Sequence, residues 1–264
     1  MTLEQYIDEL QSKGQYFFLS EEAMGILGCS KEAFKLASIR LKAKHRLCNI
    51  RGGFWTIIPH EYTSWRVLPA SWFINQLMNY LGTPYYIGLL SAAALHGAAH
   101  QQPQQFQVMV SEPVRPILKG RVTIKFFKNS LVSKVPITKL QSETGYMNVS
   151  TAEVTALDLV KFYRKAGHLS NIATVLSELK EKLDVNDFIK VAIPSLYEWP
   201  ILQRLGYLLS LEGVGGQEFS DPIHKLISQH KPRFVPLVHQ ADYKKSNKDL
   251  NWRLYINEEV ELDL

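Results

Sequence analysis

The sequence has little cysteine and no long uninterrupted apolar run. Its 264 residues include two cysteines, Cys29 and Cys48. They have no second pair and no histidine cluster beside them, which excludes a disulfide framework and a cysteine-based metal site. The most apolar runs, 85–99 and 205–211, are too short or too interrupted to span a bilayer. The first residues carry acids and lack the basic and apolar segments of a secretory signal. We therefore expect a cytoplasmic protein with reduced, packed thiols.

Signatures of catalysis are also missing. The glycine-rich segment 213–216 lacks the Lys-Ser/Thr pair of a phosphate-binding loop. Ser91 is not flanked by the glycines of a hydrolase nucleophile elbow, and no Asp-x-Asp triplet supplies the paired acids of a nucleotidyltransferase. His96 and His100 are four residues apart, but Gly97 stands where a metalloprotease has glutamate. We expect a protein that is not an enzyme, with no catalytic residues, no metal and no cofactor.

The net charge of +5 is modest but unevenly distributed. Residues 63–150 carry eight Lys or Arg against two Asp or Glu, whereas residues 151–264 carry fourteen against sixteen. Between residues 30 and 51, seven cations are accompanied by the single acid Glu32. Such clustering indicates an anionic polymer as a binding partner.

The segment 30–45 predicts a basic amphipathic helix. Ser30 is a favourable N-cap, and neither Gly nor Pro interrupts the run. The helical spacing of Phe34, Ala37 and Leu41 predicts a buried stripe. A second face beside this stripe is polar and basic, and consists of Lys31, Lys35, Ser38, Lys42 and His45. An ordinary surface helix with solvated lysines is the alternative interpretation.

The neighbours of this helix favour a role in DNA binding. We expect helices over 2–12 and 20–27, a short strand at 16–19, and a hairpin of 46–50 and 54–58 around Gly52-Gly53. Helix, helix, short turn, basic helix and hairpin is the order of a winged helix-turn-helix. Its predicted DNA-binding residues are Lys31, Lys35, Ser38, Lys42, His45 and, on the hairpin, Arg51. A hairpin that only packs the domain is the alternative for the last of these.

The middle of the chain predicts two helices, two strands and a second basic surface. A helix over 72–81 precedes a buried helix over 85–97, and alternating strands are expected at 106–110 and 121–127 in a hairpin-like region. The exposed cations of this region form a possible second basic surface, made by Lys119, Arg121, Lys125 and Lys128. Solvated cations and a nucleic-acid contact remain equally open here.

The remainder is mostly helical. A capping box at 150–153 precedes a helix over 154–160, and helices follow at 170–183, 185–192 and 198–211, with a final strand at 252–257. The fold class is therefore α+β, with a winged helix-turn-helix domain over 1–62 and a larger mixed α/β domain over 63–264. A further boundary is possible near 148.

Several segments resemble the AbiEi-type antitoxins of type IV toxin–antitoxin systems, which are linked to abortive infection. These segments are 86–97 (YIGLLSAAALHG), Gln102-Pro103, 150–153 (STAE), 156–158 (ALD), 204–209 (RLGYLL) and 252–257 (WRLYIN). The resemblance implies an N-terminal domain that binds inverted repeats of double-stranded DNA in its own promoter and represses transcription. It implies a C-terminal antitoxin domain that antagonises a nucleotidyltransferase-like toxin without a stable complex. A stand-alone winged-helix regulator that senses a ligand or partner is the alternative.

Overall fold

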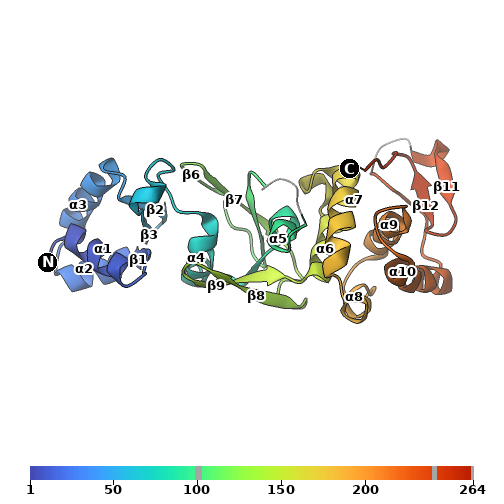
Figure 1. Ribbon diagram of the computed structural model, residues 1–264, viewed down its shortest axis with the longest axis horizontal. Helices are drawn as coiled ribbons and strands as arrows, with labels where there is room; N and C mark the ends of the chain where they lie inside the picture. Colours follow the sequence, from blue (N-terminus) through green and yellow to red (C-terminus); the bar gives the residue numbers. More distant parts are fainter. Residues whose placement is uncertain (99–102, 240–242, 263–264) are drawn as a thin grey trace. The chain divides into compact units, whose positions relative to one another are not determined.

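The computed structural model describes residues 1–98, 103–239 and 243–262, and its described part has a mixed α/β fold (Figure 1). Two compact units share the chain. The first unit consists of Met1–Ile87, Gln104–Val132 and Lys139–Val149, and the second of Gly88–Pro103, Ser133–Thr138 and Ser150–Leu264. Among the described residues, every helix is too short or too polar to cross a lipid bilayer.

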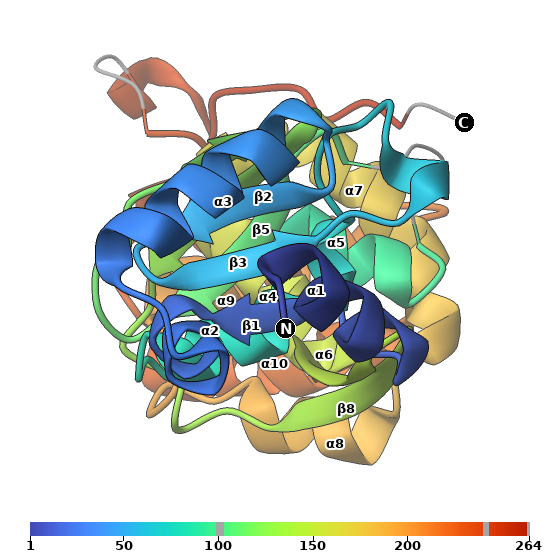
Figure 2. The same ribbon diagram turned by 90° about the vertical axis from the view of Figure 1, so that its left-hand side faces the viewer.

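The N-terminal part of the first unit contains three helices and a small antiparallel sheet (Figure 2). In chain order its elements are α1 (Leu3–Ser12), β1 (Phe17–Leu19), α2 (Ser20–Leu27), α3 (Lys31–Ala43), β2 (Leu47–Arg51) and β3 (Phe54–Ile57). Strand β3 lies between β1 and β2. Gly28 ends α2 with a positive φ of 59°, and Gly52 turns the hairpin at 53°. The predicted elements of this region are therefore present, with ends that differ by one or two residues.

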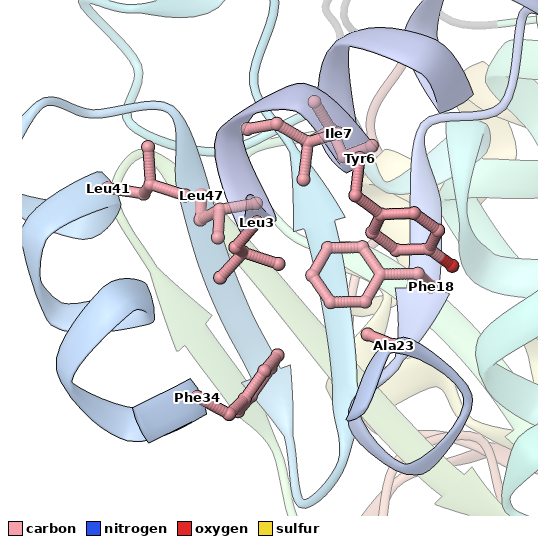
Figure 3. Close-up of a cluster of buried hydrophobic side chains, with 9 residues drawn as sticks. Leu3, Tyr6, Ile7, Phe18, Ala23, Phe34, Leu41 and Leu47 are labelled. Carbon is pink, nitrogen blue, oxygen red and sulfur yellow. The ribbon is translucent and has the colours of Figure 1, made fainter. Parts of the chain in front are cut away.

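A hydrophobic core joins the three helices to the sheet. Phe18 is fully buried, and its ring contacts Tyr6 edge-on at a centroid distance of 5.8 Å. Figure 3 shows these two rings close together, with Leu3 next to Phe18. Apolar residues at helical spacing on α1 and α3 line this core, which consists of Leu3, Tyr6, Ile7, Phe18, Ala23, Phe34, Leu41, Leu47 and Ile57. Burial of this cluster fixes which face of α3 remains outside.

A six-stranded sheet makes up most of the rest of the first unit. Its strand order is β6-β7-β5-β4-β9-β8. The strands are β4 (Tyr85–Ile87), β5 (Phe106–Val110), β6 (Ile117–Lys119), β7 (Val122–Lys128), β8 (Ile137–Ser142) and β9 (Gly145–Ser150), and α4 (Ile74–Tyr80) precedes them. Short 3-10 helices η1 (His60–Tyr62) and η2 (Ala70–Trp72) connect α4 to the N-terminal elements.

Two predictions for this region are wrong. The predicted hairpin-like pairing of 106–110 with 121–127 is a parallel pair, β5 with β7, and the antiparallel partner of β7 is β6. The predicted helix over 85–97 begins with a strand instead, because Tyr85–Ile87 pairs with β5 on one side and β9 on the other. Tyrosine and isoleucine favour a buried strand, and the helix starts only after Gly88.

The second unit is a group of helices with a small mixed sheet. Its helices are α5 (Leu89–Leu95), α6 (Ala152–Lys161), α7 (His168–Leu179), α8 (Val185–Val191), α9 (Trp199–Ser210) and α10 (Gln217–His230). Three-residue 3-10 helices follow α6, α7 and β10, and are η3 (Tyr163–Lys165), η4 (Lys180–Lys182) and η5 (Tyr243–Lys245). The sheet has the order β10-β12-β11, with β10 (Val235–Pro236), β11 (Asn247–Asp249) and β12 (Leu254–Ile256).

Helix α6 is the centre of the second unit, since all its residues from Ala152 to Val160 are buried. It contacts α5, α7, α8 and α9, and Figure 1 shows α6 and α7 side by side in yellow. The predicted helices at 154–160, 170–183, 185–192 and 198–211 correspond to α6 through α9. Helix α10 is not predicted from the sequence, because its interior Pro222 normally indicates a helix end.

Candidate nucleic-acid interface and antitoxin domain

Helix α3 presents a row of lysines to solvent. Ser30 caps the helix as predicted, since its Oγ accepts a hydrogen bond from the Ala33 amide at 3.2 Å. Lys31, Lys35 and Lys42 are exposed, and no ion pair in the described part of the chain involves them. These three ammonium groups are therefore available to an anionic partner.

Two predicted members of this face lie elsewhere. Ser38 is 3% exposed and its Oγ donates a hydrogen bond to the Lys35 carbonyl at 3.0 Å. Its position, four residues after Phe34 and three before Leu41, places it on the buried face, so its predicted exposure is wrong. His45 lies beyond the end of α3 in a left-handed conformation with φ of 56°. It is half-buried and does not continue the helical row.

Other cations at the end of α3 are bound to acids of α1. Lys44 pairs with Glu4 at 3.1 Å, and Arg46 pairs with Asp8 at 2.5 Å. Arg40, by contrast, is exposed and has no ion pair among the described residues. Arg40 could have been identified from the sequence. It directly precedes the buried Leu41, and consecutive residues of a helix do not share a face.

The geometry of Arg51 does not favour its predicted role as a DNA contact on the hairpin. Its guanidinium donates hydrogen bonds to the carbonyl oxygens of Arg115 and Pro116, the latter at 3.2 Å. Partial burial and the charge of Arg115 lower the pKa of Arg51. The turn is also covered, since the Gly53 amide donates to the Tyr80 hydroxyl at 3.0 Å. Arg51 therefore anchors the hairpin to the segment before β6.

The second basic surface follows the β6–β7 hairpin. Arg121 is exposed in its turn, whereas Lys119 and Lys125 are half-buried and Lys128 pairs with Glu112 at 3.5 Å. Burial raises the pKa of the Cys48 thiol, and the charges of Lys119 and Lys42 act in the opposite direction. Strand β2, which carries Cys48 and follows α3, contacts β6. The two basic regions are neighbours within the first unit.

The described residues contain no group of three His, Cys, Asp or Glu placed to hold a metal ion. Nε2 of His96 lies 2.8 Å from the Ser150 carbonyl oxygen, which is a structural contact. His100 lies outside the described residues. Cys29 and Cys48 are both free thiols.

The start of α6 holds buried polar groups. The N-cap is Thr151, which accepts a bond from Val154, and not Ser150 as the predicted capping box requires. Glu153 instead accepts a hydrogen bond from the amide of Asp184 at 3.0 Å, next to the N-terminus of α8. Further along α6, Asp158 accepts one from the Tyr197 hydroxyl at 3.0 Å. These carboxylates connect α6 to the segments around α8, so their role in the fold is structural.

Residues 86–211 match the family described as the AbiEi antitoxin C-terminal domain. This part of the chain belongs to the AbiEi antitoxin family. At the family level, this match supports an antitoxin of a type IV toxin–antitoxin system. A search of curated proteins found no significant match to the chain.

The fold of this AbiEi-type antitoxin is similar to that in the crystal structure of RV2827C protein from Mycobacterium tuberculosis. The TM-score is 0.68, and the likeness covers 95% of this chain and 89% of the other at 13% sequence identity. At this identity the likeness shows a shared fold.

Two further segments of the AbiEi resemblance, 204–209 and 252–257, are in contact at Gly206 and the indole ring of Trp252. Gln203 donates from Nε2 to the carbonyl oxygens of Trp252 and Arg253, at 3.2 and 2.9 Å. Arg204 donates from Nε to the Leu237 carbonyl at 2.8 Å. Burial lowers the pKa of Arg204. The side chains of α9 in the AbiEi-type antitoxin therefore hold the small C-terminal sheet in place.

Proposed function

We propose that this AbiEi-type antitoxin binds double-stranded DNA of its own promoter through an N-terminal winged helix-turn-helix and represses transcription. We further propose that its C-terminal domain antagonises a nucleotidyltransferase-like toxin. The proposed domains are those expected from the sequence, 1–62 and 63–264.

The arrangement of α2 and α3 supports the DNA-binding half of this proposal. Three residues separate the two helices, and Gly28 supplies the left-handed turn between them. The second helix of such a pair is the one that enters the major groove of DNA. The observation that carries the proposal is the row of Lys31, Lys35 and Lys42 on the outer side of α3, without ion pairs in the described part of the chain.

The candidate DNA-binding residues fall into two groups, exposed cations that suit phosphate and residues that are engaged within the chain. The α3 lysines suit phosphate oxygens, because an ammonium group is a compact point charge. Arg40 is added to this set by its exposure, and His45 stays a candidate at the helix end. The second basic surface extends the phosphate contacts beyond α3. Ser38 and Arg51 have structural roles in this proposal because both are engaged within the chain.

A promoter-binding assay tests this half directly. The probe is the duplex upstream of the chain's own coding sequence, and the competitor is an unrelated duplex of equal length. We expect selective binding by the wild type and weaker binding by the Lys35→Ala/Lys42→Ala double variant. Lys225→Ala, an exposed change on α10, is the matched control. Equal binding to both duplexes would contradict promoter recognition.

A rescue assay tests the antitoxin half. Co-expression with the neighbouring gene of the operon should relieve the growth arrest that this gene causes alone. The α3 double variant should still rescue when both genes are expressed from foreign promoters, because toxin antagonism is assigned to the C-terminal domain. If promoter binding occurs without rescue, the chain is a stand-alone winged-helix regulator, which is the second candidate.

A further inference from the structure

Two large apolar side chains lie next to each other on the outer face of α3. Leu36 is 58% exposed and Ile39 is 52% exposed. Their spacing of three residues makes them neighbours on the helix surface, and the exposed Ala43 follows Ile39 at a spacing of four. The opposite face of α3 is already occupied by the core through Phe34 and Leu41. We call Leu36, Ile39 and Ala43 the apolar ridge.

The surroundings of the apolar ridge favour a polyanion as its partner. Lys35 and Lys42 follow one flank, and Arg40 lies on the other. Glu32 is the only acid on this helix. An apolar strip with two lysines on one flank and one arginine on the other is complementary to the floor of a DNA groove, where phosphates line both edges and base edges lie between them.

We propose that the apolar ridge reads thymine through its C5-methyl group, with Leu36 and Ile39 as specificity-determining residues. This inference rests on the proposed DNA binding and names the feature of DNA that is recognised. In the major groove the thymine methyl is the apolar group presented by the base pairs. Leucine and isoleucine side chains have no hydrogen-bonding atoms, so they can discriminate bases only by such apolar contact. The flanking cations then contact phosphates and position the ridge.

A substitution in the DNA isolates this methyl group. The promoter duplex is prepared once with thymine and once with uracil at every thymine position. Uracil keeps the Watson–Crick edge and lacks only the C5-methyl. The wild type should bind the thymine duplex about four-fold more tightly for each methyl that it contacts. This factor corresponds to the usual hydrophobic free energy of burying one carbon. The Leu36→Ala/Ile39→Ala double variant should bind both duplexes with the same affinity.

Alanine suits this test, because it has the highest helix propensity and adds no polar atom. Ile189→Ala is the matched control, since Ile189 is an exposed isoleucine of α8 with 43% exposure. This control should keep the full preference for thymine. A preference that arises from altered shape of the uracil duplex would persist in the double variant and would overturn the proposal.

Other outcomes are equally decisive. If the wild type binds the two promoter duplexes equally well, the methyl readout is wrong while the DNA-binding function stands. If it binds neither duplex, the proposed function fails and the inference falls with it. A double variant that keeps its thymine preference but loses self-association, measured by light scattering, would identify the ridge as an interface between copies.

Discussion

A hydrogen bond between Arg51 and Pro116 attaches the N-terminal hairpin to the loop before β6. The guanidinium Nη2 donates to the Pro116 carbonyl at 3.2 Å and also to that of Arg115. The residue expected to reach DNA from the hairpin tip therefore satisfies backbone oxygens of its own unit.

We expect Arg51→Ala to lower the free energy of unfolding by about 1–2 kcal/mol, because two carbonyl oxygens lose a charged donor. It should leave the salt dependence of DNA binding unchanged. Urea denaturation measures the first effect and fluorescence anisotropy across salt concentrations the second. A flatter salt slope at unchanged stability would instead show that Arg51 contacts a phosphate.

Lys35→Ala and Lys42→Ala should act on DNA binding and not on folding. Each lost phosphate contact should flatten the log–log salt slope by roughly 0.9. Neither side chain has an ion pair in the part of the chain that the structure describes, so unfolding midpoints should stay the same. Lys225→Ala provides the reference slope. If all three variants share the wild-type slope, the interface is not on this side of α3.

Gly206→Ala should destabilise the protein. A Cβ at this position of α9 would overlap with the indole ring of Trp252, and relief of such a clash typically costs about 1–3 kcal/mol. Gly25→Ala is the matched control, because Gly25 lies within α2 with no atom within 4 Å of the added Cβ. That change should stabilise by up to about 1 kcal/mol through helix propensity. Equal unfolding midpoints for the two variants would disprove the close contact.

Tyr197→Phe should also reduce stability, because it removes the hydroxyl that donates to Asp158. Tyr197 is 1% exposed and Asp158 is fully buried. Loss of a hydrogen bond to a buried carboxylate costs about 1–3 kcal/mol. Tyr146→Phe, at a side chain that is 59% exposed, should change the free energy of unfolding by less than about 0.5 kcal/mol. A Tyr197→Phe variant as stable as this control would contradict the assignment.

Alkaline pH should weaken the first unit through Tyr85. Burial raises the pKa of Tyr85 to about 12, although the hydrogen bond from the Asn148 amide lowers the pKa in part. Because the folded pKa lies above the ordinary value of 10.0, the contribution to stability is complete below that value and is lost as pH rises toward 12. Tyr85→Phe should therefore lose less stability than the wild type over this interval in denaturation experiments. Parallel pH profiles would rule out Tyr85 as the source.

Much of the N-terminal part was predictable because local signals specify it. Ser30 caps α3, Gly28 ends α2, and the helical spacing of Phe34 and Leu41 identifies the buried stripe. Each signal acts within one or two turns of helix. Ser38 shows the limit of such reasoning, because a small polar residue can lie on the outer face or at the edge of the core.

Pairing between distant segments was not predictable in the same way. The periodicity of β5 and β7 correctly indicates strands but carries no information on direction, and they pair in parallel. Tyr85–Ile87 became a strand because both of its neighbours in the sheet come from elsewhere in the chain. Tertiary pairing of this kind overrides the helical continuation suggested by the small residues after it.

The sequence by itself determined the helices around α3, the clustering of their cations and the family of residues 86–211, since each depends on the order and type of residues. Tertiary structure alone decided which of those cations remain available. Lys44, Arg46 and Arg51 are held by acids or carbonyl oxygens that are distant in sequence, whereas Lys31, Lys35 and Lys42 face solvent. The reason is physical: charge is a property of the residue, but its partner depends on what folding brings within a few ångströms.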